Sequence, residues 1–537
     1  MNNKSTSSKN FLNGASILMV ALAITKVIGF IYKIPLTRIL EGAGNGYYNE
    51  AYQIYSFLFV ISTGGLPIAI AKMISESNAV GRIKEPRKIL SLALKTFAII
   101  GAIGMLIMIF CAKWFALSIF KTEQSALGMI TVAPAIFFVS LGSAFKGFFQ
   151  GYKNMVPTAL YQIIEAGTKL LGFIFIFILI ALGYANRPEV LASGAIFGVT
   201  LGSFTSMSFM FFRFYFGKEK IEVPSENPIE SRSNGALFKA MLSIAIPITI
   251  SSSIMSLTNT IDTMLLKNSL IVSGLDAQTA HFHYGSYTML YSLFNLPPTL
   301  TQTIGISVLP FISSLFATGK KKEAYENMDS SMRIVSLIAA PCAVGMSLFS
   351  RPILTLIYGG LDKEIDIAAP AFTILALGIY LVAMAYPLNI FLQAIGKARV
   401  PMYSMIVGAV LKITTNVLLV SNPNIRTNGA PFGTLACYGA VLVINMIMLY
   451  KYQRYKPHFV SVFVKPILAA VISVGLAAIG YGFTGGGGIM TLLFIGVAAL
   501  LYLILIFVLK AINRYDVLLL PKGEKLCDIL TRKGLIK

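Results

Sequence analysis

Long apolar stretches separated by short polar segments run through the whole chain. Each stretch holds about 20 residues, enough for a helix to cross a hydrocarbon core about 30 Å thick. About fourteen stretches meet this length, at residues 12–34, 48–71, 89–111, 127–149, 156–183, 190–215, 238–266, 284–315, 330–350, 367–394, 401–420, 429–451, 460–482 and 489–511. The pattern predicts an all-α integral membrane protein with about 14 transmembrane helices.

Short motifs recur in the same order in the two halves of the chain. Leu66-Pro67 recurs 243 positions later as Leu309-Pro310. The run Lys-Ile-Leu-Ser-Leu that begins at Lys88 recurs 245 positions later as Arg-Ile-Val-Ser-Leu, beginning at Arg333. A shift of 243 or 244 also relates Gln150, Lys153 and Pro157 to Gln393, Lys397 and Pro401. Three matches in order at nearly one shift favour a duplication over chance, and duplicated helical halves are typical of transporters.

The repeat also predicts the division of the chain into parts. Six helices per repeat, an even number, give both halves the same orientation in the membrane, with a cavity between them. The predicted parts are an N-terminal six-helix lobe at 1–216, a cytoplasmic linker at 217–236, a C-terminal six-helix lobe at 237–452, and two further helices with a basic cytoplasmic tail at 453–537. The last two helices would form either a lipid-facing groove or a stabilising pair.

Composition and charge agree with a membrane protein. The 537 residues are 56% hydrophobic and only 12% charged, which no ordinary soluble protein matches. The net charge is +22, but most Lys and Arg fall in the tails and in alternate loops. This asymmetry follows the positive-inside rule, places both termini in the cytoplasm, and argues against nucleic acid as a partner. Basic clusters such as Lys320–Lys322 would instead attract anionic lipid head groups.

The sequence carries no recognisable signal for catalysis or metal binding. Its four cysteines stand alone, without metal-ligand spacing. Gly485–Gly488 lacks the Lys-Ser/Thr ending of a phosphate-binding loop. His281, His283 and His458 supply no His/Asp cluster of the kind that an enzyme acting on polyprenyl phosphates would need. We therefore expect a transporter without a metal or another cofactor.

Charged residues around the first two apolar runs predict an anionic substrate. Lys26 lies about 20 Å along its helix at 1.5 Å per residue, too deep to reach water easily, so we expect it to face a cavity. Lys33 and Arg38 lie toward the outer end, where long side chains reach the membrane surface. Lys26, Lys33 and Arg38 would suit an anionic head group moving outward. Glu50 would gate the outer mouth or be a solvated loop acid.

Other polar residues inside apolar runs are candidates for gating or for a charge relay. Glu165 and Lys169 share a helix face at i, i+4 spacing. They would form either a structural ion pair or a relay that changes partners during transport. Asp262, Lys412 and Asn416 would meet as an oxygen-rich site beside an ammonium group, or else be separate residues that contact cavity water.

The beginning of the chain resembles a known family. The segment Thr25-Lys26-Val27-Ile28-Gly29-Phe30, followed by Arg38-Ile39-Leu40 and Gly42-Ala43-Gly44, is similar to the first helix and turn of MOP-superfamily lipid flippases. The stretch from Tyr48-Asn49-Glu50-Ala51-Tyr52 through Gly65-Leu66-Pro67 resembles the SpoVB/YtgP branch of MurJ-like proteins of Gram-positive bacteria. The resemblance covers essentially the full length, including the order of six, six and two helices.

The resemblance implies both a fold and a function. The fold would be MurJ/MATE-like, with two six-helix lobes around a V-shaped cavity and a groove for a lipid tail on the last two helices. The function would be transfer of lipid II, the undecaprenyl-pyrophosphate-linked peptidoglycan precursor, from the inner to the outer leaflet of a bacterial plasma membrane by alternating access. Lipid II, membrane lipids and cell-wall synthesis proteins are the partners that it implies.

The resemblance also assigns site residues. Lys26 matches a cavity arginine of the family, and Glu50 lies near a family acid. The chain departs from the family at 284–310, where a basic residue is common but only neutral polar groups such as Asn295 occur. Lys412 would compensate from another helix.

The resemblance also bears on sodium binding, and two other functions are alternatives to the transfer of lipid II. Some relatives hold sodium in the second lobe, and Asp262 with Asn416 would be the candidates here. Lys412 disfavours sodium, because two cations would compete for one acid. A flippase for another lipid-linked oligosaccharide would share the cationic cavity. A MATE-like cation or drug antiporter would need an acidic, aromatic-lined cavity instead.

Overall fold

In the computed structural model, helices joined by short turns and loops make up the described part of the chain. The structure describes residues 2–63, 65–82, 84–152, 154–217, 231–397, 399–513 and 516, without the helix side chains of 2–20, 22–23, 26, 30, 79, 247, 250–252, 254–262, 300, 303–311, 313–314 and 317. Within this part, eleven helical segments are long and apolar enough to cross a membrane. The apolar runs thus become long helices, as their length predicts.

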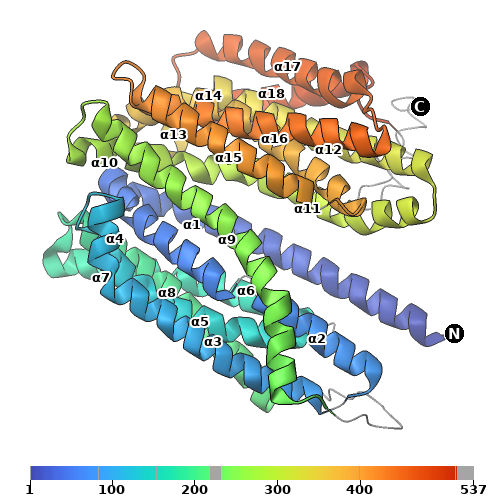
Figure 1. The fold of residues 1–537 in the computed structure, drawn as a ribbon. Coiled ribbons are helices and arrows are strands. Elements are labelled where there is room, and N and C mark those ends of the chain that lie inside the picture. The colour runs from blue at the N-terminus through green and yellow to red at the C-terminus, as the bar shows by residue number, and fades with distance from the viewer. Residues whose placement is uncertain are drawn as a thin grey trace. The chain divides into compact units, whose positions relative to one another are not determined.

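The chain divides into two compact units, unit 1 up to Lys267 and unit 2 from Asn268 onward. The helices of unit 1 are α1 (Asn2–Thr63), α2 (Leu66–Val80), α3 (Glu85–Phe110), α4 (Ala112–Ile119), α5 (Ser125–Gly151), α6 (Val156–Lys169), α7 (Gly172–Leu179), the π-helical turn η1 (Ile180–Tyr184), α8 (Pro188–Phe216) and most of α9 (Asn234–Val272) (Figure 1). The central helix is α5, which packs against α1, α2, α3 and α8. It is rich in buried small residues, and these allow the close packing of its neighbours.

The first two apolar runs form one continuous element rather than two separate helices. α1 covers the first run and the second run as far as Thr63, where α2 takes over from Leu66, and its only break is at Glu41, whose φ of 56° and ψ of −165° are not helical. A positive φ is unusual for a residue with a side chain. The turn expected between residues 34 and 48 is therefore reduced to a kink at one residue.

Unit 2 begins with the last residues of α9. Its other helices are α10 (Ala277–Thr288), α11 (Leu290–Ala317), α12 (Lys321–Leu348), α13 (Ser350–Tyr358), α14 (Asp362–Ala394), α15 (Arg399–Val420), the short η2 (Arg426–Gly429), α16 (Ala430–Gln453), the π-helical turn η3 (Val460–Val464), α17 (Lys465–Gly482) and α18 (Gly488–Val508). α14 contacts α11, α12 and α16 and forms the centre of this unit. α17 and α18 pair with each other and pack on α12 and α13.

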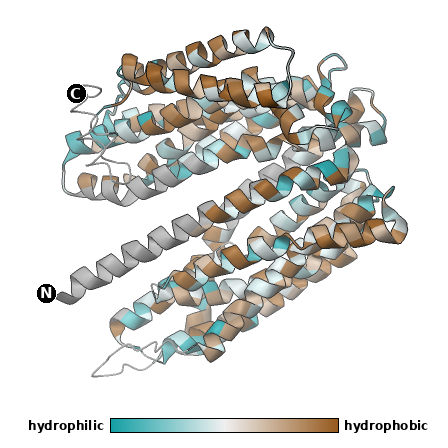
Figure 2. Cartoon of the chain, turned by 180° about the vertical axis from the view of Figure 1, so that it is seen from behind, coloured by the Kyte–Doolittle hydropathy of each residue, from teal (hydrophilic) through white to brown (hydrophobic). Residues whose placement is uncertain are grey.

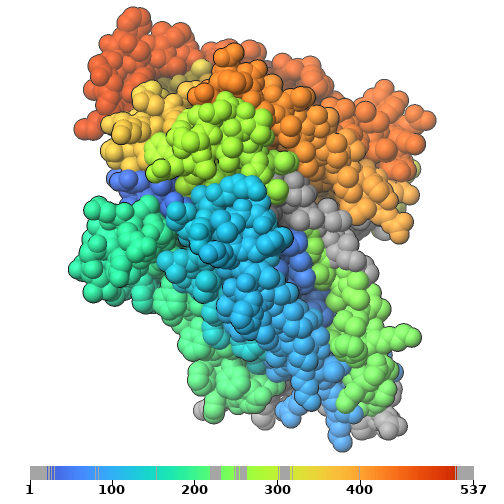
Figure 3. Space-filling model, turned by 60° about the vertical axis from the view of Figure 1, so that its left-hand side comes forward, coloured from blue at the N-terminus to red at the C-terminus, as the bar shows by residue number. Residues whose placement is uncertain are grey.

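Hydrophobic residues line the bodies of the helices, and many polar residues gather at their ends and in the loops (Figure 2). The first part of α9 lies beside α3 on the face seen in Figure 3. Leu237, Met241 and Ala245 of α9 are buried in one apolar cluster with Ile89 and Phe97 of α3. The first turns of α9 therefore belong to the core of unit 1.

Candidate functional site

Lys33 turns into unit 1 instead of reaching outward as its position predicts. Its Nζ donates to Asn45 Oδ1 at 2.8 Å and lies 4.5 Å from the centroid of the Tyr48 ring. Both Asn45 and Tyr48 follow the kink of α1, so the kink brings a donor and its partners together on one helix. Arg38, by contrast, is exposed.

Glu165 and Lys169 lie on α6, where α8 approaches very closely. A Cβ added to Gly202 of α8 would lie 2.7 Å from the carbonyl oxygen of Glu165, and one added to Gly198 would lie 2.5 Å from that of Lys169. Only glycine fits such an approach of two helix backbones. Among the described residues, no ion pair within 4.0 Å joins Glu165 to Lys169, so the direct pair that their spacing predicts is not formed.

Lys169 contacts aromatic rings instead of pairing with Glu165. Lys169 Nζ lies 5.2 Å from the centroid of Tyr52 and 5.8 Å from that of Tyr32. Lys146 of α5, which the sequence did not single out, lies in the same way 4.4 Å from the centroid of Tyr161. The negative face of an aromatic ring attracts a cation within about 6 Å of its centroid. Each of these lysines is therefore stabilised by a neutral partner.

The rings belong to an aromatic row along α1. Tyr48 and Tyr52 stack with their centroids 6.1 Å apart, Tyr52 and Tyr55 are 5.6 Å apart, and Tyr55 and Phe59 are 5.8 Å apart. Residues three or four apart share one face of a helix, so this row faces a single direction. It gives unit 1 a polar and aromatic interior beside its lysines.

The charges in this interior do not cancel. Three lysines, Lys33, Lys146 and Lys169, contact tyrosine rings, and Glu165 lies within electrostatic reach of both Lys146 and Lys169. One carboxylate therefore faces more than one ammonium. Ionisable groups inside a membrane protein are costly and mark functional sites by default. The arrangement can bind an anion.

A second polar cluster of unit 1 surrounds Glu50. Lys267 Nζ lies 2.7 Å from Glu50 Oε1, and both side chains are 0% exposed. Thr122 donates to Glu50 Oε2 at 2.9 Å, Ser125 donates to the same oxygen, and Lys267 donates to Thr122 at 2.7 Å. The interpretation of Glu50 as a solvated loop acid is therefore wrong. Lys267 could not be singled out from the sequence, because this residue directly follows an apolar run, where a lysine is usually exposed.

The candidates of the second half are only partly brought together. Lys412 is half-buried on α15, one turn from the buried Asn416. A Cβ on Gly433 of α16 would lie 2.1 Å from Asn416 Oδ1, so α16 passes directly over this amide. Asn295 is exposed and donates to the carbonyl of Tyr291 at 2.8 Å.

Two candidates lie outside the described side chains, namely Lys26 and Asp262. The Asp262–Lys412 pair and the proposed sodium ligands thus stay predictions. Within the described part of the chain, no group of three or more His, Cys, Asp and Glu side chains could hold a metal ion.

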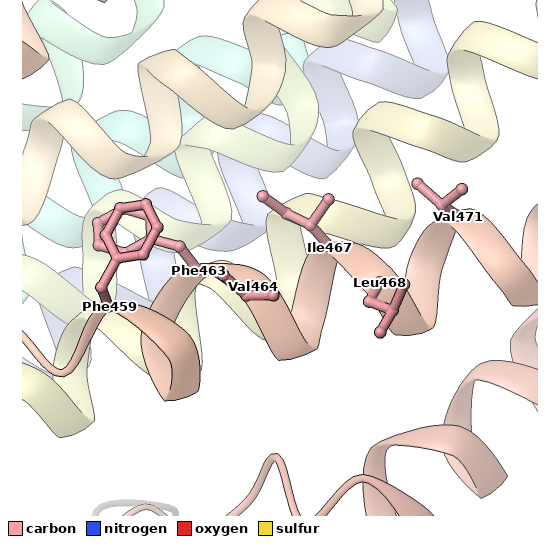
Figure 4. Close-up of a pocket in the computed structure, with 6 residues that line it drawn as sticks. All are labelled: Phe459, Phe463, Val464, Ile467, Leu468 and Val471. Carbon is pink, nitrogen blue, oxygen red and sulfur yellow. The ribbon is translucent and has the colours of Figure 1, made fainter.

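An apolar pocket of about 300 Å³ is formed along η3 and the start of α17 (Figure 4). Its lining residues are Phe459, Phe463, Val464, Ile467, Leu468 and Val471. The lining is wholly apolar, and Phe459 is 63% exposed. A pocket of this chemistry fits a hydrocarbon chain.

Comparisons with known proteins agree on one class. Lipid II flippase MurJ of Bacillus subtilis (strain 168) is 26% identical over 461 residues, covering 83% of this chain and 84% of that protein. Stage V sporulation protein B of the same organism is 24% identical over 521 residues, covering 96% and 98%. A solved structure of lipid II flippase MurJ in an inward-closed conformation has a TM-score of 0.69 at 16% identity, covering 92% of this chain and 98% of that one. The fold and the helix lengths define the class as an all-helical, multi-pass membrane protein with a MurJ-like fold.

Matches of the sequence to models of known protein families identify the family of the chain. The model described as polysaccharide biosynthesis protein matches residues 11–316, and the MatE model matches residues 247–418. Since the first covers more than half of the 537 residues, the chain belongs to the polysaccharide biosynthesis protein family. The predicted MurJ/MATE-like fold and the resemblance to the MurJ and SpoVB proteins are thereby confirmed.

Proposed function

We propose that the protein is a lipid II flippase, which moves the undecaprenyl-pyrophosphate-linked precursor from the inner to the outer leaflet of a bacterial plasma membrane by alternating access. The surplus of positive charge inside unit 1 carries the proposal. Lys33, Lys146 and Lys169 outnumber Glu165 there, which suits an anionic pyrophosphate and opposes a cationic drug. The name of the Bacillus subtilis relative supports lipid II as the substrate.

The proposed roles extend to the candidates from the sequence. Substrate contacts are assigned to Lys26, Lys33, Arg38, Asn295 and Lys412. Gating or charge relay is assigned to Glu50, Glu165, Lys169, Asp262 and Asn416. The lobes at 1–216 and 237–452 would rock about the cavity between them, with both termini in the cytoplasm. No metal or cofactor takes part in this scheme.

The apolar pocket on η3 and α17 is the proposed site for the lipid tail of the substrate. A polyprenyl chain gains free energy by staying in an apolar environment while its head group crosses. The lining of Phe459, Phe463 and Leu468 offers such an environment on the surface of α17. We assign the pocket to a segment of the lipid tail.

The membrane potential would supply part of the driving force. Moving one elementary charge across the membrane is worth about 2.3 kcal/mol per 100 mV. An inside-negative potential favours the outward movement of an anionic head group, and it also favours the inward return of a positively charged empty carrier. Cell-wall synthesis proteins would consume the product outside.

Depletion of the protein in its own host, with any redundant flippase removed, tests the proposal. Lipid II is then labelled in each leaflet while wild type, Lys26→Ala, Lys33→Ala or the control Lys113→Ala is expressed at matched levels. The Lys113 side chain is 69% exposed and pairs with Glu123, so its loss should leave transport intact. We expect lipid II to accumulate inside and only wild type and the control to restore its export. An unchanged distribution of lipid II on depletion would contradict the proposal.

A second candidate is a flippase for another lipid-linked oligosaccharide. The match of residues 11–316 to the polysaccharide biosynthesis protein family favours it. The same depletion separates the two functions, because it would then trap a different undecaprenyl-linked glycan in the inner leaflet.

A further inference from the structure

One turn of α12 holds the segment that leads into the α17–α18 hairpin. Asp329 accepts a hydrogen bond from the Tyr455 hydroxyl at 2.5 Å and pairs with His458 Nδ1. One turn further, Arg333 Nη1 donates to Ser461 Oγ at 3.3 Å. Asp329 and Arg333 are only 4% and 5% exposed, whereas the His458 side chain is 81% exposed, so the contacts run from the interior of unit 2 to its surface.

The same turn holds the segment that follows the hairpin. Arg333 Nε lies 2.9 Å from Asp516 Oδ2, and Ser330 donates to Asp516 Oδ1. The backbone N–H of Asn513 donates to Asp516 Oδ2 at 2.7 Å, which fixes the carboxylate relative to the end of α18. Both ends of the hairpin are thus bound by residues 329–333.

The internal repeat contains an equivalent device in unit 1. Glu85 lies 244 positions before Asp329 and is likewise buried. It accepts from the Arg232 guanidinium at 2.6 and 3.0 Å and from the Arg232 backbone N–H at 2.9 Å. Arg232 follows the sixth predicted helix, just as Tyr455 follows the twelfth. In both halves, an acid at the same position holds the segment that leaves the six-helix bundle.

The network on α12 ends where the apolar pocket begins. His458 directly precedes Phe459, the first lining residue, Ser461 lies two positions after Phe459, and Phe463 follows one turn after Phe459. Tyr455 and Phe463 are buried in one cluster with Met328 and Met332 of α12. A substitution at Asp329 or Arg333 would therefore displace the helical turn that carries the first lining residues of the pocket.

We propose that Asp329 and Arg333 are positioning residues, which hold the α17–α18 hairpin on unit 2 so that its pocket can receive the polyprenyl chain of the substrate. The inference rests on the proposed function, because it takes the occupant of the pocket to be the lipid tail. Neither residue contacts the pocket lumen, so both act through the placement of η3 and α17. The contact of Arg333 with segments before and after the hairpin makes it the more important of the two.

Photocrosslinking tests this assignment. A benzoylphenylalanine replaces Leu468 in the full chain in nanodiscs, and capture of undecaprenyl phosphate is measured for wild type, Arg333→Asp and the charge swap Arg333→Asp/Asp516→Arg. We expect Arg333→Asp to lower capture at least tenfold and the swap to restore at least half of it. Arg351→Asp breaks an exposed ion pair with Asp366 on the same unit and should change nothing.

A distance measurement keeps the test decisive if Arg333→Asp folds poorly. Spin labels at the exposed residues Leu377 of α14 and Ile479 of α17 report the placement of the hairpin within unit 2. We expect a broader distance distribution in the milder variant Asp329→Asn than in wild type, and the wild-type distribution in the charge swap.

Two results would overturn the inference, and both are distinct from failure of the flippase proposal. Unchanged capture and unchanged distances in folded Arg333→Asp would show that the network does not position the pocket. Absence of capture at Leu468 in wild type would show that the pocket does not take the chain, even if depletion still traps lipid II inside. If the distances and the capture behave as expected but depletion leaves the distribution of lipid II between the leaflets unchanged, the positioning role stands and lipid II is rejected as the substrate.

Discussion

Replacing Lys267 by methionine would leave Glu50 as a buried carboxylate without its ammonium partner. Methionine keeps most of the length of the side chain, so the change removes mainly the charge. Breaking a buried ion pair by removing one partner costs about 3–5 kcal/mol. Glu50 keeps the hydrogen bonds from Thr122 and Ser125, so we expect the lower end of this range. A loss of about 3 kcal/mol changes the unfolding equilibrium by roughly a hundredfold.

Unfolding of the detergent-solubilised protein by increasing SDS measures this loss. The double variant Glu50→Gln/Lys267→Met removes both charges and should recover about 2 kcal/mol, because no uncompensated buried charge remains. The control is Lys113→Met, which breaks an ion pair of the same 2.7 Å length whose side chains are 69% and 59% exposed. Exposed pairs contribute at most about 1 kcal/mol.

The reasoning would be refuted by either of two results. If Lys267→Met is no more destabilising than Lys113→Met, the pair is not buried in the folded protein. Alternatively, the double variant could be less stable than Lys267→Met alone. The hydrogen bonds would then stabilise the cluster independently of its charges.

Three further predictions concern charge, packing and pH. Lys33→Arg should retain about tenfold more lipid II transport than Lys33→Ala in the leaflet assay, since arginine keeps the charge; equal losses would contradict an electrostatic role. Gly202→Ala should lower stability by about 1–3 kcal/mol in the SDS assay, because its Cβ would lie 2.7 Å from the Glu165 carbonyl, whereas Gly235→Ala meets no atom within 4 Å. Burial lowers the pKa of His283 below its usual 6.5, so the unfolded chain binds this proton more tightly and stability falls as the pH drops below 6.5. His283→Asn should lose less stability between about pH 7 and pH 5 in thermal unfolding, and an identical pH profile would reject this account.

The apolar pattern predicted the fold well because hydrophobic length decides whether a helix can span a membrane. It did not predict that the first two runs join in one helix. The residues around Glu41 are polar enough for a turn, and only the backbone geometry shows that one positive φ suffices. The pattern likewise separated residues 156–183 from their neighbours but not α6 from α7 within that run.

The site was less predictable, because its partners lie far apart in the sequence. The i, i+4 spacing correctly placed Glu165 and Lys169 on one helix, yet Lys169 contacts tyrosines more than 100 positions earlier. Lys267 and Glu50 are 217 positions apart, and no local pattern joins them. Asp329 could have been found from the sequence, because the repeat relates it to Glu85.

The contact of lysines with tyrosine faces has an energetic consequence for a carrier. A ring lowers the cost of burying an ammonium but brings no negative charge, so the ammonium can still attract an anion beyond the ring. On the proposed function, the substrate supplies the negative charge that Glu165 alone does not provide for Lys33, Lys146 and Lys169. The empty interior is then its most charged state, and loading brings it closer to neutrality. On the proposed function, binding therefore relieves part of the repulsion among these ammonium groups.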